Sequence, residues 1–193
     1  MRIHGENEII RSVDVNQEND YKKYVPHLRE DFKHICGYCG KPEEVTTKGF
    51  EPDHFVPDRI DSSRKLDYSN LVYSCFTCNR KKLGKWPTEN KDKPNDGEVG
   101  FVDPVLKEYD THLGRDKEGS IEFYTNIGKY MYKKAFRFDI RPMKEIWKIS
   151  QLINAKKNLL EIKDKLTLEE YMKYLELDEA IEELKTILFE KKE

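Results

Sequence analysis

The four cysteines of this chain form two Cys-x-x-Cys pairs, and no cysteine is left over. One pair is Cys36 and Cys39, and the other is Cys75 and Cys78. Two such pairs supply the four thiolates of a tetrahedral zinc site, which leaves no open position on the ion and is therefore structural. The alternative, four ordinary thiols, is disfavoured by the paired spacing. We expect a zinc-stapled fold over residues 36–82, supported by the rest of the chain.

The segment between the two pairs is too long for a simple zinc loop. Thirty-five residues separate Cys39 from Cys75, against roughly 15–20 in a zinc ribbon. Additional secondary structure must therefore fill the interval, and the apolar and polar runs predict its order. We expect a strand, a polar loop, a second strand and a helix, over residues 50–56, 58–69, 71–73 and 76–83.

The composition limits the class of protein. The chain has 193 residues, of which 37% are charged and 37% hydrophobic, and its net charge is −2. This composition is polar but globular. It excludes a protein that binds polyanions over its whole surface, so any nucleic-acid surface must be a local patch. Because no apolar run is long enough to span a bilayer and the first residues contain no apolar signal region, we expect a cytoplasmic protein without membrane contact.

The regions around the cysteines are predicted to be partly helical. Residues 21–35 carry apolar side chains at helical spacing, with Pro26 in the first turn, and would lead the chain into Cys36. Residues 85–100 are rich in turn formers and charge, which is typical of a surface loop. Residues 120–124 alternate between polar and apolar, which indicates a strand.

Two helices are expected to finish the chain. The first runs from about residue 142 to residue 165, and the second follows a capping-box pattern formed by Thr167 and Glu170. They would form a helical hairpin that either packs on the core or docks a partner. The expected domains are an N-terminal arm, a central domain and a mostly helical C-terminal region, over residues 1–19, 20–105 and 106–193.

Polar residues accompany the cysteine pairs in a distinctive order. Asp53-His54 follows the first pair, Asn70-Leu71 precedes the second pair, and Asn79 and Lys82 follow it. This order resembles the HNH endonuclease family over about a quarter of the chain. The resemblance implies an α+β fold with a ββα-metal core, stapled by the four-cysteine zinc site and flanked by helices. It also implies a hydrolase that cuts phosphodiester bonds.

The resemblance implies a role for each of these residues. His54 would be the general base that activates water. Asp53 and Asn79 would hold one Mg²⁺ or Mn²⁺, because hard oxygen ligands favour these ions. Asn70 would brace the loop between the strands and orient His54. The family often has a histidine where this chain has Asn79, and the amide disfavours catalysis with Ni²⁺ or Zn²⁺.

Structural alternatives stay open for the same residues. Adjacent side chains of a strand point to opposite faces, so one of Asp53 and His54 would serve the core unless the strand is irregular. Asn79 would cap the backbone donors of its helix instead of binding a metal. Asn70 would be a turn former.

A basic cluster follows the predicted metal helix. It contains Arg80, Lys81, Lys82 and Lys85, and Arg59, Arg64 and Lys65 lie in the preceding loop. These side chains would contact the DNA backbone beside the scissile bond, although a solvated charged face is the common alternative. No recognition helix or aromatic stacking ladder predicts base reading.

Three functions are consistent with these motifs. The first is an HNH endonuclease that nicks DNA or cuts both strands, with RNA as an open alternative substrate. The second is a zinc-stapled module that binds nucleic acid or protein without catalysis. The third is an effector held in check by another protein, because residues 161–193 contain 11 acidic residues against 6 lysines and would suit a basic partner. By analogy with small HNH proteins of bacterial anti-phage defence, that partner would be an ATPase; a homodimer is the other arrangement.

Overall fold

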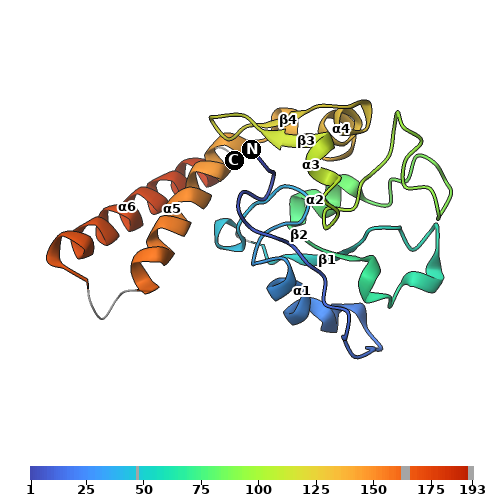
Figure 1. The fold of residues 1–193 in the computed structure, drawn as a ribbon, viewed down its shortest axis with the longest axis horizontal. Helices are drawn as coiled ribbons and strands as arrows, with labels where there is room; N and C mark the ends of the chain where they lie inside the picture. Colours follow the sequence, from blue (N-terminus) through green and yellow to red (C-terminus); the bar gives the residue numbers. More distant parts are fainter. Residues whose placement is uncertain (47, 162–165, 191–193) are drawn as a thin grey trace. The chain divides into compact units, whose positions relative to one another are not determined.

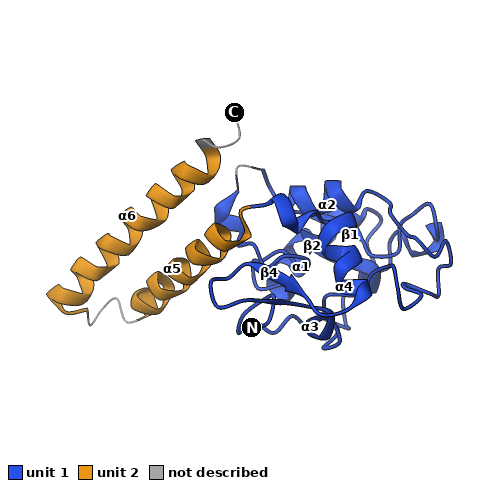
Figure 2. Ribbon diagram, turned by 90° about the horizontal axis from the view of Figure 1, so that it is seen from above, with its two compact units in different colours: residues 1–141 blue, residues 142–193 orange. Residues whose placement is uncertain are grey.

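The computed structural model describes residues 1–46, 48–161 and 166–190, which form an α+β fold (Figure 1). The chain divides into two compact units, Met1–Arg141 and Pro142–Glu193 (Figure 2). The boundaries expected after residues 19 and 105 do not coincide with this division. The reason lies at the N-terminus, where the terminal amine donates to the Arg115 carbonyl at 2.7 Å. The Arg115 amide donates back to the Met1 carbonyl at 2.8 Å, so the first residues pack with a distant part of unit 1.

Two short strands lie between the cysteine pairs, and the helix that follows them carries Cys78. Strand β1 (Glu51–His54) pairs antiparallel with β2 (Leu71–Ser74), with Asp53 opposite Val72 and His54 opposite Leu71. Helix α2 (Phe76–Lys82) follows β2 directly and ends where Leu83 adopts a left-handed conformation. The predicted order of strand, loop, strand and helix is therefore observed.

The segment before the first cysteine pair contains less helix than predicted. A 3-10 turn over Tyr21–Tyr24 leads into α1 (Val25–Asp31), with a proline in the first turn of the helix. The prediction extended this helix to residue 35, but Lys33 and His34 have φ angles of 53° and 61°. Two successive left-handed residues cannot continue a right-handed helix, and they turn the chain towards the first cysteine.

A second small sheet completes unit 1. Strand β3 (Leu113–Arg115) pairs antiparallel with β4 (Ile121–Phe123), which lies within the strand predicted over residues 120–124. Helices α3 (Tyr109–His112) and α4 (Asn126–Tyr130) flank it. The segment 85–100 is irregular, as predicted, but it is not purely a surface loop. Trp86 is buried within it, between the rings of Phe55 and Phe101.

Unit 2 consists of two long helices. Helix α5 (Met143–Glu161) and helix α6 (Leu168–Glu190) are joined through residues 162–165, which lie outside the described residues. The predicted capping box opens α6: the Thr167 hydroxyl accepts from the Glu170 amide at 3.2 Å, and the Glu170 carboxylate accepts from the Thr167 amide at 2.8 Å. Among the described helices, none combines the length and apolar character that crossing a membrane requires.

Candidate functional site

The four cysteines meet in the interior of unit 1. Their sulfur atoms all lie within 4.8 Å of one another, and those of Cys39 and Cys75 are 3.9 Å apart. A tetrahedral zinc with Zn–S bonds of about 2.3 Å separates its sulfurs by roughly 3.8 Å, so the cluster fits this ion. The tight turn that carries the first two cysteines, here called the knuckle, ends directly after Cys39, at Gly40. Its φ is +65°, and a Cβ there would lie 2.5 Å from the Ile3 carbonyl oxygen, so only glycine fits.

The imidazole of His54 is fixed at the end of β1 by two contacts. Its Nε2 lies 2.9 Å from the Lys65 carbonyl oxygen, and its ring meets the ring of Tyr21 edge-on with centroids 4.7 Å apart. A carbonyl oxygen only accepts hydrogen bonds, so Nε2 carries the proton of the neutral ring and Nδ1 carries the lone pair. His54 is half-buried, and among the described residues Nδ1 has no hydrogen-bond partner. The ring is therefore held in one orientation, with its lone pair on Nδ1.

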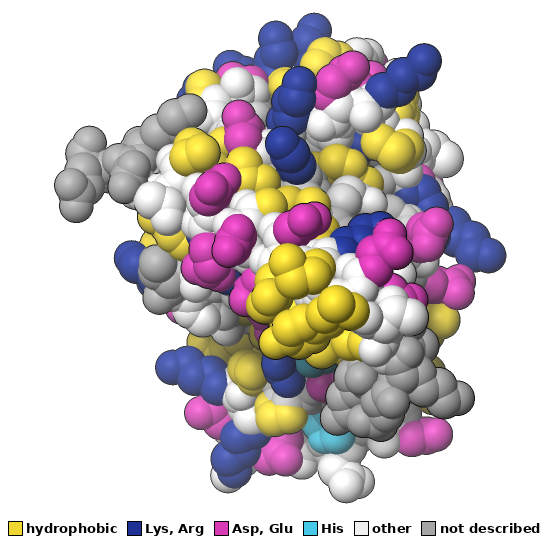
Figure 3. Space-filling model, turned by 90° about the vertical axis from the view of Figure 1, so that its left-hand side faces the viewer, with side chains coloured by type: hydrophobic (Ala, Val, Ile, Leu, Met, Phe, Trp, Pro, Cys, Tyr) yellow, Lys and Arg dark blue, Asp and Glu magenta, His cyan; other side chains and the backbone are white. Residues whose placement is uncertain are grey.

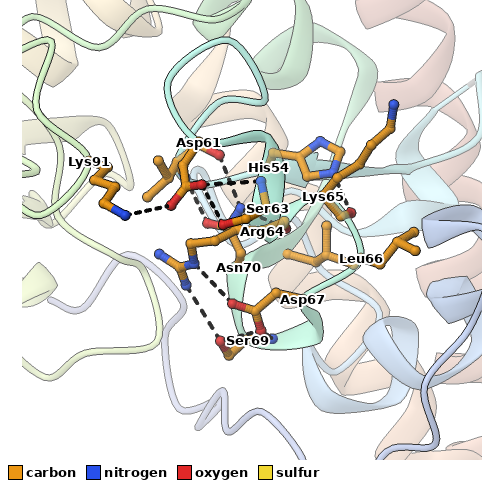
Figure 4. A network of polar contacts seen from close by, with 12 residues as sticks. His54, Asp61, Ser63, Arg64, Lys65, Leu66, Asp67, Ser69, Asn70 and Lys91 are labelled. Carbon is orange, nitrogen blue, oxygen red and sulfur yellow. Dashed lines mark hydrogen bonds and ion pairs between the residues drawn. The ribbon is translucent and has the colours of Figure 1, made fainter.

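Asn70 clamps the loop that carries the Lys65 carbonyl (Figure 4). Its Oδ1 accepts from the Val56 amide at 2.8 Å, and its Nδ2 donates to the Val56 carbonyl at 3.0 Å and to the Arg64 carbonyl at 3.3 Å. Asn70 is 1% exposed. Because Arg64 is the neighbour of Lys65, this buried amide holds in place the carbonyl that orients His54.

The carboxylate of Asp53 points away from solvent and towards α2. The Tyr38 hydroxyl donates to its Oδ2 at 2.5 Å, and the Lys82 ammonium lies 3.0 Å from the same oxygen. Burial, with the charge of Asp53 second, raises the pKa of Tyr38 well above its ordinary value, so the phenol stays a neutral donor. Asp53 Oδ2 is thus occupied by two protein groups.

Lys82 links two neighbouring positions of β1. Besides its ion pair with Asp53, its Nζ donates to the His54 carbonyl at 2.6 Å and lies 5.7 Å from the centroid of the Phe101 ring. Its side chain is 1% exposed. We expected Lys82 on the DNA-binding face with Arg80 and Lys81. The structure instead buries it, because α2 turns this side chain inward to the Asp53 carboxylate.

Asn79 lies one helical turn before Lys82 and contacts a different residue of β1. Its Nδ2 donates to Glu51 Oε2 at 2.7 Å. Glu51 and Asp53 are two apart on the strand and therefore share a face. Among the described residues, no hydrogen bond joins Asn79 to Asp53 or His54. The Asn79 amide therefore lies against the face of β1 that carries Glu51 and Asp53.

A comparison with protein families matches residues 36–84 to the HNH endonuclease family. The chain contains an HNH domain. The matched residues include the cysteine cluster, Asp53-His54, Asn70 and Asn79. No curated protein and no solved structure matches the chain.

The basic residues of the HNH domain differ in how far they remain available. Arg80 and Lys81 are exposed, and the Arg80 guanidinium lies over the Phe76 ring at 5.1 Å. Arg59 is bound to the Glu89 carboxylate at 2.6 and 2.8 Å, and Lys85 Nζ donates to the Lys134 carbonyl at 2.9 Å. Arg80 and Lys81 thus remain less committed to protein partners than Arg59, Lys82 and Lys85.

Sequence reasoning missed two residues that lie outside the HNH match. Tyr21 covers one side of the His54 ring, and Arg141 lies against the cysteine sulfurs. The pattern around Tyr21 predicted a helix and gave no sign of its contact with His54. Nothing in the local sequence marks Arg141, because its partners are 63 or more residues away.

Proposed function

We propose that the chain is a metal-dependent endonuclease that hydrolyses phosphodiester bonds of DNA. The observation that carries this proposal is the orientation of His54: the Lys65 carbonyl holds Nε2, and none of the residues that the structure describes hydrogen-bonds to Nδ1. A neutral imidazole in this arrangement accepts a proton from water at physiological pH. In the proposed reaction, His54 Nδ1 takes the proton of the water that attacks phosphorus.

The other HNH residues support this base. Asn70 fixes the loop and, through Arg64, the position of the Lys65 carbonyl. Lys82 ties the His54 backbone and the Asp53 carboxylate to α2. Asp53 Oδ1 and Asn79 Oδ1 would hold a Mg²⁺ or Mn²⁺. Such an ion, when bound, would stabilise the charge that develops on the phosphate and on the leaving oxygen.

Nicking of supercoiled plasmid with Mg²⁺ or Mn²⁺ tests the proposal. His54→Ala should reduce the rate by about 10²–10⁴-fold, the usual contribution of a general base. His27→Ala is the matched control, because His27 is exposed in the same unit and is expected to leave the rate unchanged. Equal rates for His54→Ala and wild type would remove His54 from the mechanism.

The same assay separates the substrates and the cleavage modes. A matched single-stranded RNA in a parallel reaction tests RNA as the substrate, and the ratio of open-circular to linear plasmid separates nicking from double-strand cleavage. Absence of wild-type activity with every metal would favour the zinc-stapled binding module instead.

A second role, docking a protein partner, is favoured by the surface of α6. Leu168, Met172 and Leu175 are 79%, 51% and 38% exposed at helical spacing. The helix also carries eight acidic residues against two lysines. Hydrophobic and acidic side chains lie next to one another on the face shown in Figure 3. Such a surface suits a partner with an apolar patch and a basic rim.

The partner hypothesis has its own test. Met172→Glu should abolish co-purification with a co-expressed ATPase partner and leave plasmid nicking unchanged. Light scattering of the pure chain tests the homodimer, and a plaque assay on cells expressing both proteins tests the anti-phage role. A chain that is monomeric by light scattering and does not co-purify with the ATPase would contradict both the homodimer and the ATPase complex.

A further inference from the structure

A half-buried cation, Arg141, faces the cysteine cluster from outside the HNH match. Arg141 Nη1 donates to Cys78 Sγ at 3.2 Å, while its Nη2 lies 3.6 Å from Cys39 Sγ and 4.0 Å from Cys75 Sγ. One guanidinium therefore contacts three of the four sulfurs. Only the planar fork of arginine presents several N–H donors to neighbouring acceptors in this way.

Aromatic packing holds this guanidinium in place. Its Cζ lies 5.2 Å from the centroid of the Phe138 ring, and Phe138 stacks on Phe136 with centroids 5.3 Å apart. Phe136 in turn packs against Tyr38 at 4.7 Å. Tyr38 lies between Cys36 and Cys39 in the sequence. The arginine is thus anchored on the same cysteine knuckle whose sulfur it contacts.

The charge of the cluster explains why a cation belongs there. Four thiolates around Zn²⁺ carry a net charge of −2, and a buried charge is costly unless it is compensated. Arg141 is always protonated and lies on the sulfurs. Arg115 adds a second cation, which is 1% exposed and whose Nη2 donates to the Cys39 carbonyl at 2.7 Å. The two arginines together match the charge of the zinc centre.

We propose that Arg141 is the counter-cation of the zinc–thiolate centre and that it holds the zinc in the HNH domain. Hydrogen bonds from the guanidinium compensate the negative charge of the metal-bound cluster, which favours the metal-bound state over the metal-free one. Partners that bind metal ligands in this way typically change metal affinity by about 10–100-fold. The segment that ends at Arg141 is then part of the zinc site, although it lies outside the residues matched to the family.

Zinc affinity of the full chain tests this inference, which rests on the zinc assignment and is independent of the nuclease reaction. Metal content of the purified protein is measured first, and a chromogenic chelator then competes for the zinc of wild type and variants. Arg141→Met should weaken zinc binding by about 10–100-fold. The zinc affinity of Arg141→Lys should lie between those of wild type and Arg141→Met, because one ammonium does not reach three sulfurs. Arg137→Met is the matched control, since the Arg137 side chain lies in the same segment, is 42% exposed and pairs with Asp139 instead of with the sulfurs.

Each outcome decides the question. Wild-type affinity in Arg141→Met would overturn the proposal, and so would an equal loss in Arg137→Met. If circular dichroism shows that Arg141→Met does not fold, wild type is compared with Arg141→Lys instead. A wild-type zinc affinity in Arg141→Lys would then overturn the role proposed for the planar guanidinium. A wild-type chain without zinc would overturn the zinc assignment and this inference together, whatever the nicking assay gives.

Discussion

The ion pair between Lys82 and Asp53 permits a quantitative prediction. The side chains are 1% and 9% exposed, and the ammonium and carboxylate are 3.0 Å apart. Lys82→Met keeps the length of the aliphatic stem but removes the charge. In this variant the Asp53 carboxylate keeps the hydrogen bond from Tyr38 but loses the ammonium, and the His54 carbonyl loses the hydrogen bond that Lys82 donates to it. Removing one partner of a buried pair typically costs about 3–5 kcal/mol, and we expect this loss in the free energy of unfolding.

A double-mutant cycle separates the pair from its surroundings. Urea unfolding at saturating zinc, followed by tryptophan fluorescence in a Trp147→Phe background so that Trp86 reports alone, gives the free energy for Lys82→Met, Asp53→Asn and the double variant. The double variant should recover about 2–3 kcal/mol relative to the sum of the single changes, because neither charge is left unpaired. Arg59→Met is the matched control: its ion pair with Glu89 is exposed, so little stability depends on it.

Two results would refute this reasoning. A loss below about 1 kcal/mol for Lys82→Met would place the pair among surface ion pairs, which contribute that little. Strict additivity in the cycle would show that the two charges do not interact. Either result would also weaken the positioning of His54 that we attribute to Lys82.

Three further predictions concern the same unit. Asn70→Ala leaves the buried Val56 amide and carbonyl without their side-chain hydrogen bonds. It should lower the free energy of unfolding, measured in urea, by about 2–3 kcal/mol. Gly37→Ala places a Cβ 2.6 Å from the Phe32 ring and should cost about 1–3 kcal/mol by overpacking, seen as a lower melting temperature at saturating zinc. Burial lowers the pKa of His4 from 6.5 to about 4. Between these two pH values the native state binds fewer protons than the unfolded state, so the free energy of unfolding falls as the pH drops from 6.5 to 4. His4→Gln should flatten that part of the stability–pH curve, and an unchanged slope would contradict the assignment.

The elements of the HNH domain were largely predictable because their signals are local. Cysteine spacing requires that the two knuckles meet, and the apolar runs on either side of a polar loop predicted β1, β2 and α2 in order. The capping box before α6 was predicted for the same reason, since Thr167 and Glu170 are neighbours on one turn. The end of α1 was not predictable, because nothing in the residue types of Lys33 and His34 demands a left-handed backbone.

The sequence by itself determined which polar groups are on offer: four thiols in two pairs, one imidazole and several carboxylate and amide oxygens in a fixed order. The tertiary structure alone decided which of these groups are free and which are committed. It pairs Lys82 with Asp53 across 29 positions, packs Tyr21 against His54 across 33, and brings Arg141 to sulfurs at least 63 residues away. The physical reason is that burial, not residue type, sets the partner of a charge, and burial exists only once distant segments have packed together.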